Sequence, residues 1–185
     1  MGVKKVNHRL MLTGLAVLCS AATVQAQSVL KANLISPFFR TANISFEKVI
    51  NQDRSLQVGF YYTGLRYKNT RFSGYGITPE YRMYLSIDQK DAPHGFYLAP
   101  FLRYQQFSLN QVDTGVGGSL TTYGGGVTGG YQALFSDRIT LDAFLGPSYN
   151  NGRVRADAGI VQSPFAISIF TGLLVRGGLT IGLKL

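Results

Sequence analysis

The 185-residue sequence has one cysteine, two histidines and no tryptophan. Cys19 and His8 both lie in the N-terminal segment, so the rest of the chain has no thiol for a disulfide or a thiolate-bound metal. The remaining histidine, His94, cannot by itself supply the several ligands of a typical zinc site. We therefore expect no metal, no cofactor and no catalytic residue. A lipid-modified Cys19 is an alternative that the bulky Leu18 before it disfavours.

Long apolar stretches are also missing. No segment has the 18 or so uninterrupted apolar residues of a membrane-spanning helix. The apolar run from Leu10 to Ala22 is shorter, follows three basic residues, and precedes small residues at Val24 and Ala26. This order of features predicts a cleaved secretory signal peptide over residues 1–26, followed by a single domain over residues 27–185.

Acidic residues are scarce: nine Asp and Glu stand against 18 Lys and Arg, for a formal net charge of +9. Basic proteins often bind nucleic acid. However, an exported chain rarely meets nucleic acid, and the basic residues here form no run. We therefore expect no nucleic-acid partner.

The chain does contain a strong two-residue alternation. From Leu179 to Leu185 every second residue is Leu or Ile, and the residues between them are Thr, Gly and Lys. One apolar face and one small or charged face suit the wall of a membrane barrel, with lipid outside and a polar lumen inside. Eight such segments are predicted, near 29–35, 42–49, 55–65, 75–87, 95–108, 121–135, 139–150 and 174–185.

This pattern predicts an all-β fold: an eight-stranded antiparallel up-and-down transmembrane β-barrel. Compact polar connections alternate with mostly longer ones, as in outer-membrane barrels, where the short side is periplasmic. The compact connections are near 51–54, 88–94 and 136–138, and the longer ones near 66–73, 109–120 and 151–172.

Two features fit this pattern poorly. Pro79, Pro100 and Pro147 fall inside predicted strands, where each removes a ladder hydrogen bond. The alternation keeps its parity across Pro79, which predicts a missing bond rather than a bulge. The segment from Ala156 to Leu173 is too apolar for a simple solvated loop, and its conformation stays open: it extends above the bilayer, folds over the mouth or plugs the barrel.

Charged residues on the inward face would share one lumen. An eight-stranded barrel is just wide enough for side chains to fill it, so we expect these charges to pair into a plug. The alternatives are a gated ion path and a pair of catalytic carboxylates. The predicted lumen charge network consists of Lys31, Glu47, Glu80, Arg82, Arg103, Asp142, Arg176 and Lys184.

The predicted outer loops are basic, with a net charge of +4, whereas the predicted turns carry about −1. Arginine binds phosphate through two parallel hydrogen bonds. We therefore hypothesise that the outer loops contact lipopolysaccharide phosphates; ordinary solvated loops explain the charge equally well. The candidate residues are Arg40, Arg66, Lys68, Arg71, Arg153 and Arg155.

Four segments carry a resemblance to a known family: ITPEYRMYLS at 77–86, HGFYLAPFLRY at 94–104, residues 124–147, and GLTIGLKL at 178–185. Pro-Glu-Tyr-Arg at 79–82 and Gly-Tyr-Gln at 130–132 are the most specific parts. The chain resembles a family of small outer-membrane barrels catalogued as a domain of unknown function. That family is similar in architecture to the transmembrane domain of outer membrane protein A. The resemblance implies an eight-stranded barrel and supplies no catalytic residues.

Together these features predict a small integral outer-membrane barrel with a structural or surface-interaction role. The expected partners are outer-membrane lipid, lipopolysaccharide and the barrel assembly machinery, although Leu185 stands where that machinery usually reads an aromatic residue. Three alternatives stay open: an exported soluble lipocalin-like binding barrel, a lipid-modifying enzyme and a narrow channel. The sequence indicates no specific ligand, protein partner or oligomeric state.

Overall fold

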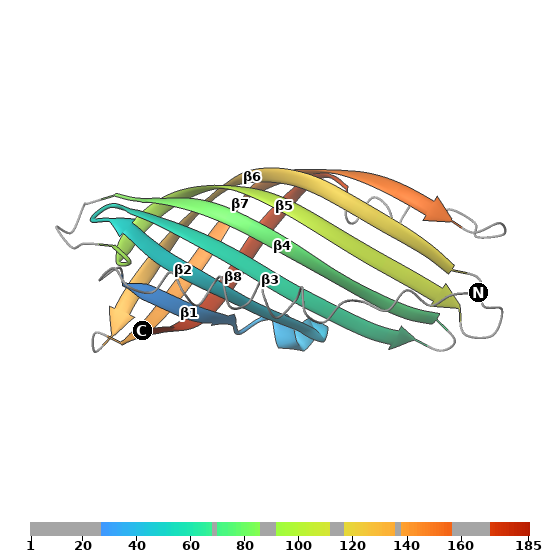
Figure 1. The fold of residues 1–185 in the computed structure, drawn as a ribbon, viewed down its shortest axis with the longest axis horizontal. Helices are drawn as coiled ribbons and strands as arrows, with labels where there is room; N and C mark the ends of the chain where they lie inside the picture. Colours follow the sequence, from blue (N-terminus) through green and yellow to red (C-terminus); the bar gives the residue numbers. More distant parts are fainter. Residues whose placement is uncertain (1–26, 68–69, 86–91, 112–116, 136–137, 157–170) are drawn as a thin grey trace, which may run out of the picture.

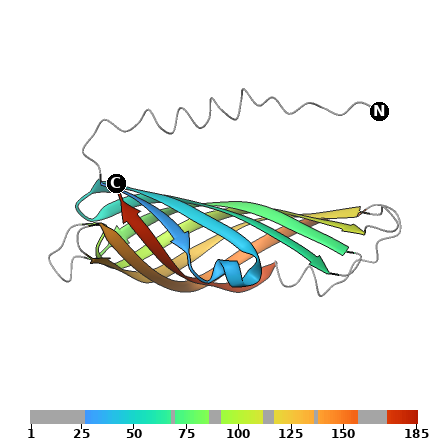
Figure 2. The same cartoon turned by 90° about the horizontal axis from the view of Figure 1, so that it is seen from below.

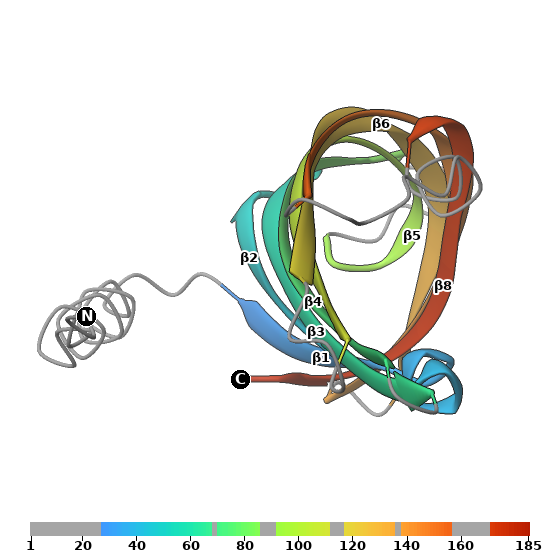
Figure 3. The same cartoon turned by 90° about the vertical axis from the view of Figure 1, so that its right-hand side faces the viewer.

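Eight antiparallel strands form a closed barrel, in which each strand pairs with its sequence neighbours and β1 also pairs with β8 (Figure 1). The computed structural model describes residues 27–67, 70–85, 92–111, 117–135, 138–156 and 171–185. Figure 3 looks along the barrel and shows the strands closed into a ring. The predicted fold is confirmed. The strands and one short 3-10 helix are β1 (Ser28–Asn33), η1 (Ser36–Phe39), β2 (Thr41–Asn51), β3 (Arg54–Tyr67), β4 (Thr70–Tyr84), β5 (Gly95–Gln111), β6 (Gly117–Phe135), β7 (Ile139–Ala156) and β8 (Gly172–Lys184).

The predicted signal peptide, residues 1–26, lies outside the described residues and stays a prediction, as does the conformation of residues 157–170. Within the described part of the chain, no helix is long and apolar enough to cross a membrane. We call the end of the barrel with the β1–β2, β3–β4, β5–β6 and β7–β8 connections the loop end. The other end, where Leu185 donates a backbone hydrogen bond to Ser28, is the turn end.

The wall of the barrel has an uneven height (Figure 2). β1 has six residues, whereas β5, β6 and β7 have 17, 19 and 18. At the loop end the longer strands also run further than predicted. Residues 66–73 were expected to form a loop, yet β3 and β4 pair as far as Tyr67 and Thr70. Backbone pairing continues there because it does not depend on apolar side chains, whereas the apolar alternation ends where the lipid would end.

Outward positions of the strands carry large apolar side chains, many of them exposed, such as Leu145 at 64% and Leu173 at 79%. Ten residue steps separate Ile139 from Tyr149 on β7, about 33 Å along the strand and about 25 Å after a tilt of ~40°. This is the height of the apolar band of outer-membrane barrels.

Two girdles of aromatic side chains border this band on the outside of the barrel, with tyrosines nearer the loop end and phenylalanines nearer the turn end. Between the two girdles, no described outward side chain is charged. The exposed girdle residues are Tyr62, Tyr75, Tyr104, Tyr123 and Tyr149, and Phe46, Phe96 and Phe135.

The strand prolines interrupt the hydrogen-bond ladder without shifting it. Pairing of β4 with β5 skips residues 78, 79, 81 and 82, around Pro79 and Pro100, yet the register is the same on both sides of the gap. Pairing of β6 with β7 is interrupted in the same way beside Pro147. Proline has no N–H to donate, so each gap is a missing bond. The prediction of a missing bond without a bulge at Pro79 is confirmed.

The direction of the side chains can be tested with spin labels, because residues 27–185 contain no cysteine. A label at Ile181, which is outward and 41% exposed, should be relaxed strongly by oxygen and weakly by a water-soluble nickel complex, because it faces acyl chains. A label at Arg71, which is exposed beyond the tyrosine girdle, should show the reverse in the same vesicles. Access of the nickel complex to Ile181 would contradict the assignment of the lipid-facing side.

Candidate functional site: the charged lumen

Inward positions of five strands bring charged side chains together in the lumen. Residues alternate between the two faces of each strand, so the inward face of one strand meets the inward faces of the strands opposite. Five of these residues are at most 2% exposed, and the side chain of a sixth is 12% exposed. We call these six residues the lumen network: Lys31 on β1, Glu47 on β2, Glu80 and Arg82 on β4, Asp142 on β7 and Arg176 on β8.

Every charge in the part of the network nearer the turn end has a partner of opposite sign. The Lys31 Nζ atom lies 2.6 Å from Glu47 Oε2 and 3.2 Å from Asp142 Oδ2. Arg82 donates to Asp142 Oδ2 at 2.8 Å through Nη1 and to Glu80 Oε2 at 3.3 Å through Nη2. Burying a charge is costly unless it is paired and hydrogen-bonded, and this arrangement meets both conditions.

Neutral hydroxyl groups complete the coordination of two carboxylates. Ser55 and Tyr84 donate to Glu47 Oε1 at 2.5 and 2.6 Å, and Tyr97 donates to Asp142 Oδ1 at 2.7 Å. The ring of Tyr97 also lies 4.3 Å from the guanidinium carbon of Arg82. These contacts bring β3 and β5 into the same cluster.

Gln132 on β6 is the remaining hub. Its Oε1 atom accepts hydrogen bonds from Lys31 at 2.6 Å and Arg82 at 3.1 Å. It also lies 3.1 Å from the Tyr84 hydroxyl, whose proton is donated to Glu47. Gly130, two residues earlier, faces the Tyr97 hydroxyl so closely that a Cβ atom there would lie 2.5 Å from it. The absence of a side chain at Gly130 therefore makes room for Tyr97.

The two most specific sequence segments of the family resemblance meet at this point. Pro-Glu-Tyr-Arg at 79–82 supplies Glu80 and Arg82, and Gly-Tyr-Gln at 130–132 supplies Gln132. The two-residue alternation puts Gln132, Tyr84 and Tyr97 on the inward face, but the predicted network contains formal charges alone and therefore omits them. The signal that could have found them is inward parity combined with a hydrogen-bonding side chain.

The lumen network continues toward the loop end through Glu80, whose Oε1 atom accepts a hydrogen bond from Arg176. The guanidinium carbon of Arg176 lies 4.5 Å from the Phe101 ring and 4.9 Å from the Phe144 ring. Arg103 lies beside Phe101 as well, at 5.5 Å.

Two of the predicted network residues stand apart from these ion pairs. Neither Arg103 nor Lys184 has an ion pair with any described residue. Arg103 faces the lumen on the loop-end side of Glu80. Lys184 is partly buried at the turn end, where it pairs in register with Val29.

All three described carboxylates of the lumen network are already hydrogen-bonded. Glu47, Glu80 and Asp142 each accept from at least two donors, so none is left as an unoccupied general base. Within the described ranges, no cluster of three or more His, Cys, Asp or Glu residues is placed to hold a metal ion. The geometry shows a hydrogen-bonded network that connects strands on opposite sides of the lumen.

The described members of the basic set predicted at the outer loops lie at the loop end. Arg40, Arg71, Arg153 and Arg155 are exposed. Arg66 pairs in register with Arg71 across β3 and β4, but its side chain is outside the described set, and so is Lys68.

Residues 10–158 match the protein family DUF3575, described as a protein of unknown function. The matched span covers most of the chain and ends just beyond β7. The chain belongs to this family. Comparison with curated proteins gives no match.

Solved structures of similar fold are bacterial outer-membrane barrels. A major outer membrane protein from Thermus thermophilus has 11% identity and a TM-score of 0.53, over 88% of this chain and 100% of that one. Neisserial surface protein A has 17% identity and a TM-score of 0.49, over 86% and 94%. The N-terminal barrel domain of Pseudomonas aeruginosa OprF has 11% identity and a TM-score of 0.44, over 87% and 100%.

This DUF3575 protein is an integral outer-membrane β-barrel. Its fold is that of outer-membrane barrels, its outer surface has an apolar band between aromatic girdles, and the described charged side chains at the level of this band point inward. A soluble lipocalin-like barrel would need the opposite arrangement, with an apolar interior and charges in solvent. The expected outer-membrane location is therefore confirmed, and the soluble alternative is not supported.

The lumen network predicts a large difference between two arginine substitutions. Arg82→Met should lower the free energy of unfolding by about 3–5 kcal/mol, because it leaves buried carboxylates without their partner. Arg103→Met should lower it by less than about 1 kcal/mol, because Arg103 has no ion pair among the described residues. Urea titration of protein folded in lipid vesicles measures both. Equal losses for the two variants would contradict the assigned role of Arg82.

Glycine substitutions on β6 provide a second test. Gly130→Val should cost about 1–3 kcal/mol of stability, because the side chain would displace Tyr97 from Asp142. Gly129→Val is the matched control: a Cβ at Gly129 would make only an ordinary contact, 3.7 Å from Leu98 Cδ2. The urea midpoint of the control should stay close to that of the wild type. If both variants unfold at the same urea concentration, the close packing of Gly130 against Tyr97 does not contribute to stability.

Proposed function

We propose that this protein is a non-conducting and non-enzymatic outer-membrane barrel with a structural or surface-interaction role. In this proposal its basic loop end binds lipopolysaccharide phosphates. The observation that carries the proposal is the position of exposed arginines just beyond the tyrosine girdle. Arg71 on β4 and Arg153 on β7 each lie four residues beyond a girdle tyrosine, Tyr75 and Tyr149. Four residues correspond to about 13 Å along a strand.

The direction of these arginines supports contact with lipid rather than with the lumen. Arg71 and Tyr75 share the outward face of β4, and Arg153 and Tyr149 share that of β7. The guanidinium carbon of Arg153 also lies 5.9 Å from the centre of the Tyr123 ring. Because girdle tyrosines mark the headgroup level, the arginines are at the height where phosphates of the outer leaflet would lie. Arginine binds such phosphates through paired, charge-assisted hydrogen bonds.

The packing of the lumen supports the absence of a pore. The network side chains from opposite walls meet in direct contact, and Arg82, Gln132 and Tyr97 are among the largest fully buried side chains of the barrel. An ion crossing the lumen would have to separate buried ion pairs, which costs several kcal/mol for each pair.

Charge reversal tests the lipopolysaccharide contact. Arg71→Glu together with Arg153→Glu should reduce the lipopolysaccharide that copurifies by about ten-fold or more, because two charge-assisted contacts become repulsive. The matched control reverses two arginines of the turn end, Arg54→Glu with Arg138→Glu, and should retain wild-type amounts. The readout is lipopolysaccharide sugar per mole of folded protein. Equal retention by the two double variants would argue against a contact at the loop end.

Planar-bilayer recording tests the closed lumen. Wild-type protein should give no stepwise conductance, because the lumen network occupies the cross-section of the barrel. A general porin inserted into the same membrane shows that single channels are detectable. Reproducible conductance steps from the purified wild type would favour the channel alternative.

The enzyme alternative has a separate test, which is the mass of lipid A in cells with and without the protein. A mass change that depends on the protein would favour that alternative.

A further inference from the structure

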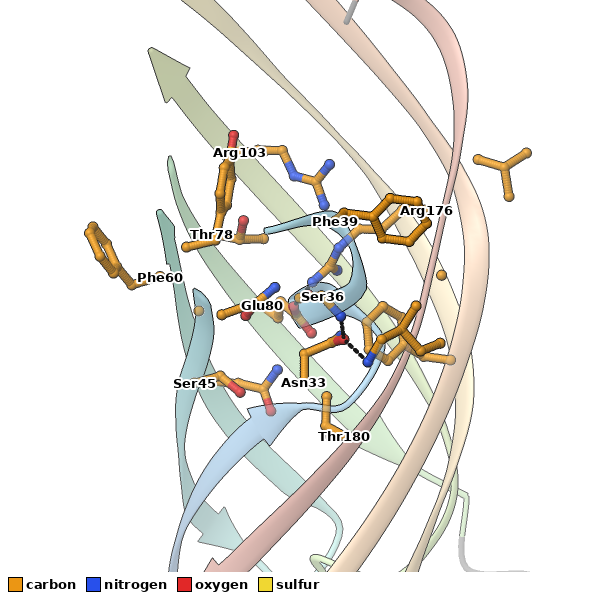
Figure 4. Close-up of a pocket in the computed structure, with 18 residues that line it drawn as sticks. Asn33, Ser36, Phe39, Ser45, Phe60, Thr78, Glu80, Arg103, Arg176 and Thr180 are labelled. Atoms are coloured by element: carbon orange, nitrogen blue, oxygen red, sulfur yellow. Dashed lines mark hydrogen bonds and ion pairs between the residues drawn. The ribbon is translucent and has the colours of Figure 1, made fainter. Parts of the chain in front are cut away.

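A cavity of about 300 Å³ lies inside the barrel on the loop-end side of the lumen network (Figure 4). Glu80, Arg176 and Arg103 line it together with polar residues of β2, β3 and β4 and with η1. Its volume is at the lower end of the range of ligand pockets, which is about 300–1,000 Å³. It has room for one small polar group with a short substituent.

The charges around the lumen do not balance at this cavity. Apart from Lys184 at the turn end, the described charged residues of the lumen are four cations, Lys31, Arg82, Arg103 and Arg176, and three anions, Glu47, Glu80 and Asp142, so the excess is one positive charge. Every anion is held by the lumen network, and Glu80 is shared by Arg82 and Arg176. The excess charge therefore resides at Arg103, on the wall of the cavity.

Hydrogen-bond donors at the cavity are also unused. Arg103 Nε and Arg176 Nη1 are shielded from solvent and have no acceptor among the described residues. A buried donor without a partner costs about 1–3 kcal/mol. Tyr61 Oη accepts a hydrogen bond from Gln105 Nε2 at 2.6 Å, so its own O–H is free to donate to a ligand.

The two guanidinium groups contact one side chain. Arg103 and Arg176 both lie against the Phe101 ring, at 5.5 and 4.5 Å. Like charges held near each other in a site of low dielectric repel strongly. An anion between them would relieve this repulsion, and it would accept hydrogen bonds from the unused donors.

We propose that this cavity is a binding site for a phosphate or carboxylate group held between Arg103 and Arg176. Guanidinium groups match the planar or tetrahedral oxygen arrays of these anions. Glu80 does not compete, because its two oxygens are already bound by Arg82 and Arg176. This inference does not depend on lipopolysaccharide binding by the loop end, since Arg71 and Arg153 are not among the residues that line the cavity.

The low wall beside β1 provides a route into the cavity. β1 ends at Asn33, whereas β8 extends further toward the loop end; of the described segments, only η1 lies between that part of β8 and β2. Val175 is 75% exposed on the outside of β8 and yet lines the cavity, as do Ile35, which precedes η1, and Phe39, its last residue. The cavity therefore reaches the outer surface of the barrel, where either a free anion or a lipid headgroup could enter.

Calorimetric titration of folded protein in a neutral maltoside detergent tests the site. The two probes are inorganic phosphate and a short-chain phosphatidic acid. We expect saturable binding that Arg103→Met weakens at least ten-fold, whereas Arg138→Met, which removes the same charge from the exposed turn end, changes it less than two-fold. Binding of both probes identifies a site for free anions, and binding of the lipid alone identifies a headgroup site. Absence of binding, or equal effects of the two variants, would overturn the proposal.

A second measurement keeps the test independent of the folding of the methionine variant. In wild-type protein, the Nε–H resonance of Arg103, assigned with Arg103→Lys, should shift downfield as the bound probe accepts its hydrogen bond. Loss of lipopolysaccharide binding in the Arg71 and Arg153 variant should leave this shift intact, so the two proposals can fail separately. A resonance that does not respond to either probe would show that another group already occupies the donor, and the proposal would be wrong.

Discussion

The carboxylate of Asp142 is the contact on which the barrel interior depends. It accepts hydrogen bonds from Lys31 on β1, Arg82 on β4 and Tyr97 on β5, while its own backbone belongs to β7. Ladder hydrogen bonds connect only neighbouring strands, whereas this carboxylate joins strands across the lumen. Because a buried charge that loses its partner is strongly destabilising, the contacts around Asp142 act as a unit.

The same constraint explains why weak positions in the wall can be tolerated. β4 carries Pro79 and pairs with β5, which carries Pro100, so the ladder between these strands lacks two donors. β4 is also the strand that supplies Glu80, Arg82 and Tyr84 to the interior. Contacts across the lumen thus stabilise β4, whose backbone pairing with β5 is interrupted.

The interior is divided into two parts with different properties. Toward the turn end, cations and carboxylates alternate in direct contact, and glycine at position 130 leaves space for the ring of Tyr97. Toward the loop end, Arg103 and Arg176 face a cavity with unused donors. The narrow cross-section of an eight-stranded barrel favours such a division, because a few large side chains are enough to fill one level completely.

The two-residue alternation by itself determined the number of strands, their order and the face of each strand that meets lipid. It did so because strand geometry is local: successive side chains point to opposite sides whatever the rest of the chain does. The same parity correctly placed Glu80 and Arg82 on the inward face. It also showed that Pro79 would cost a bond without shifting the register.

Only the tertiary structure decided which inward residues touch. Lys31 and Asp142 are 111 positions apart, and their contact depends on the stagger of strands around the closed barrel, which no local pattern encodes. The structure likewise separated Arg103 and Lys184 from the other predicted charges, and it added the neutral Tyr97 and Gln132. Strand ends at the loop end were also beyond the reach of the sequence, because apolar alternation stops with the lipid while backbone pairing continues into water.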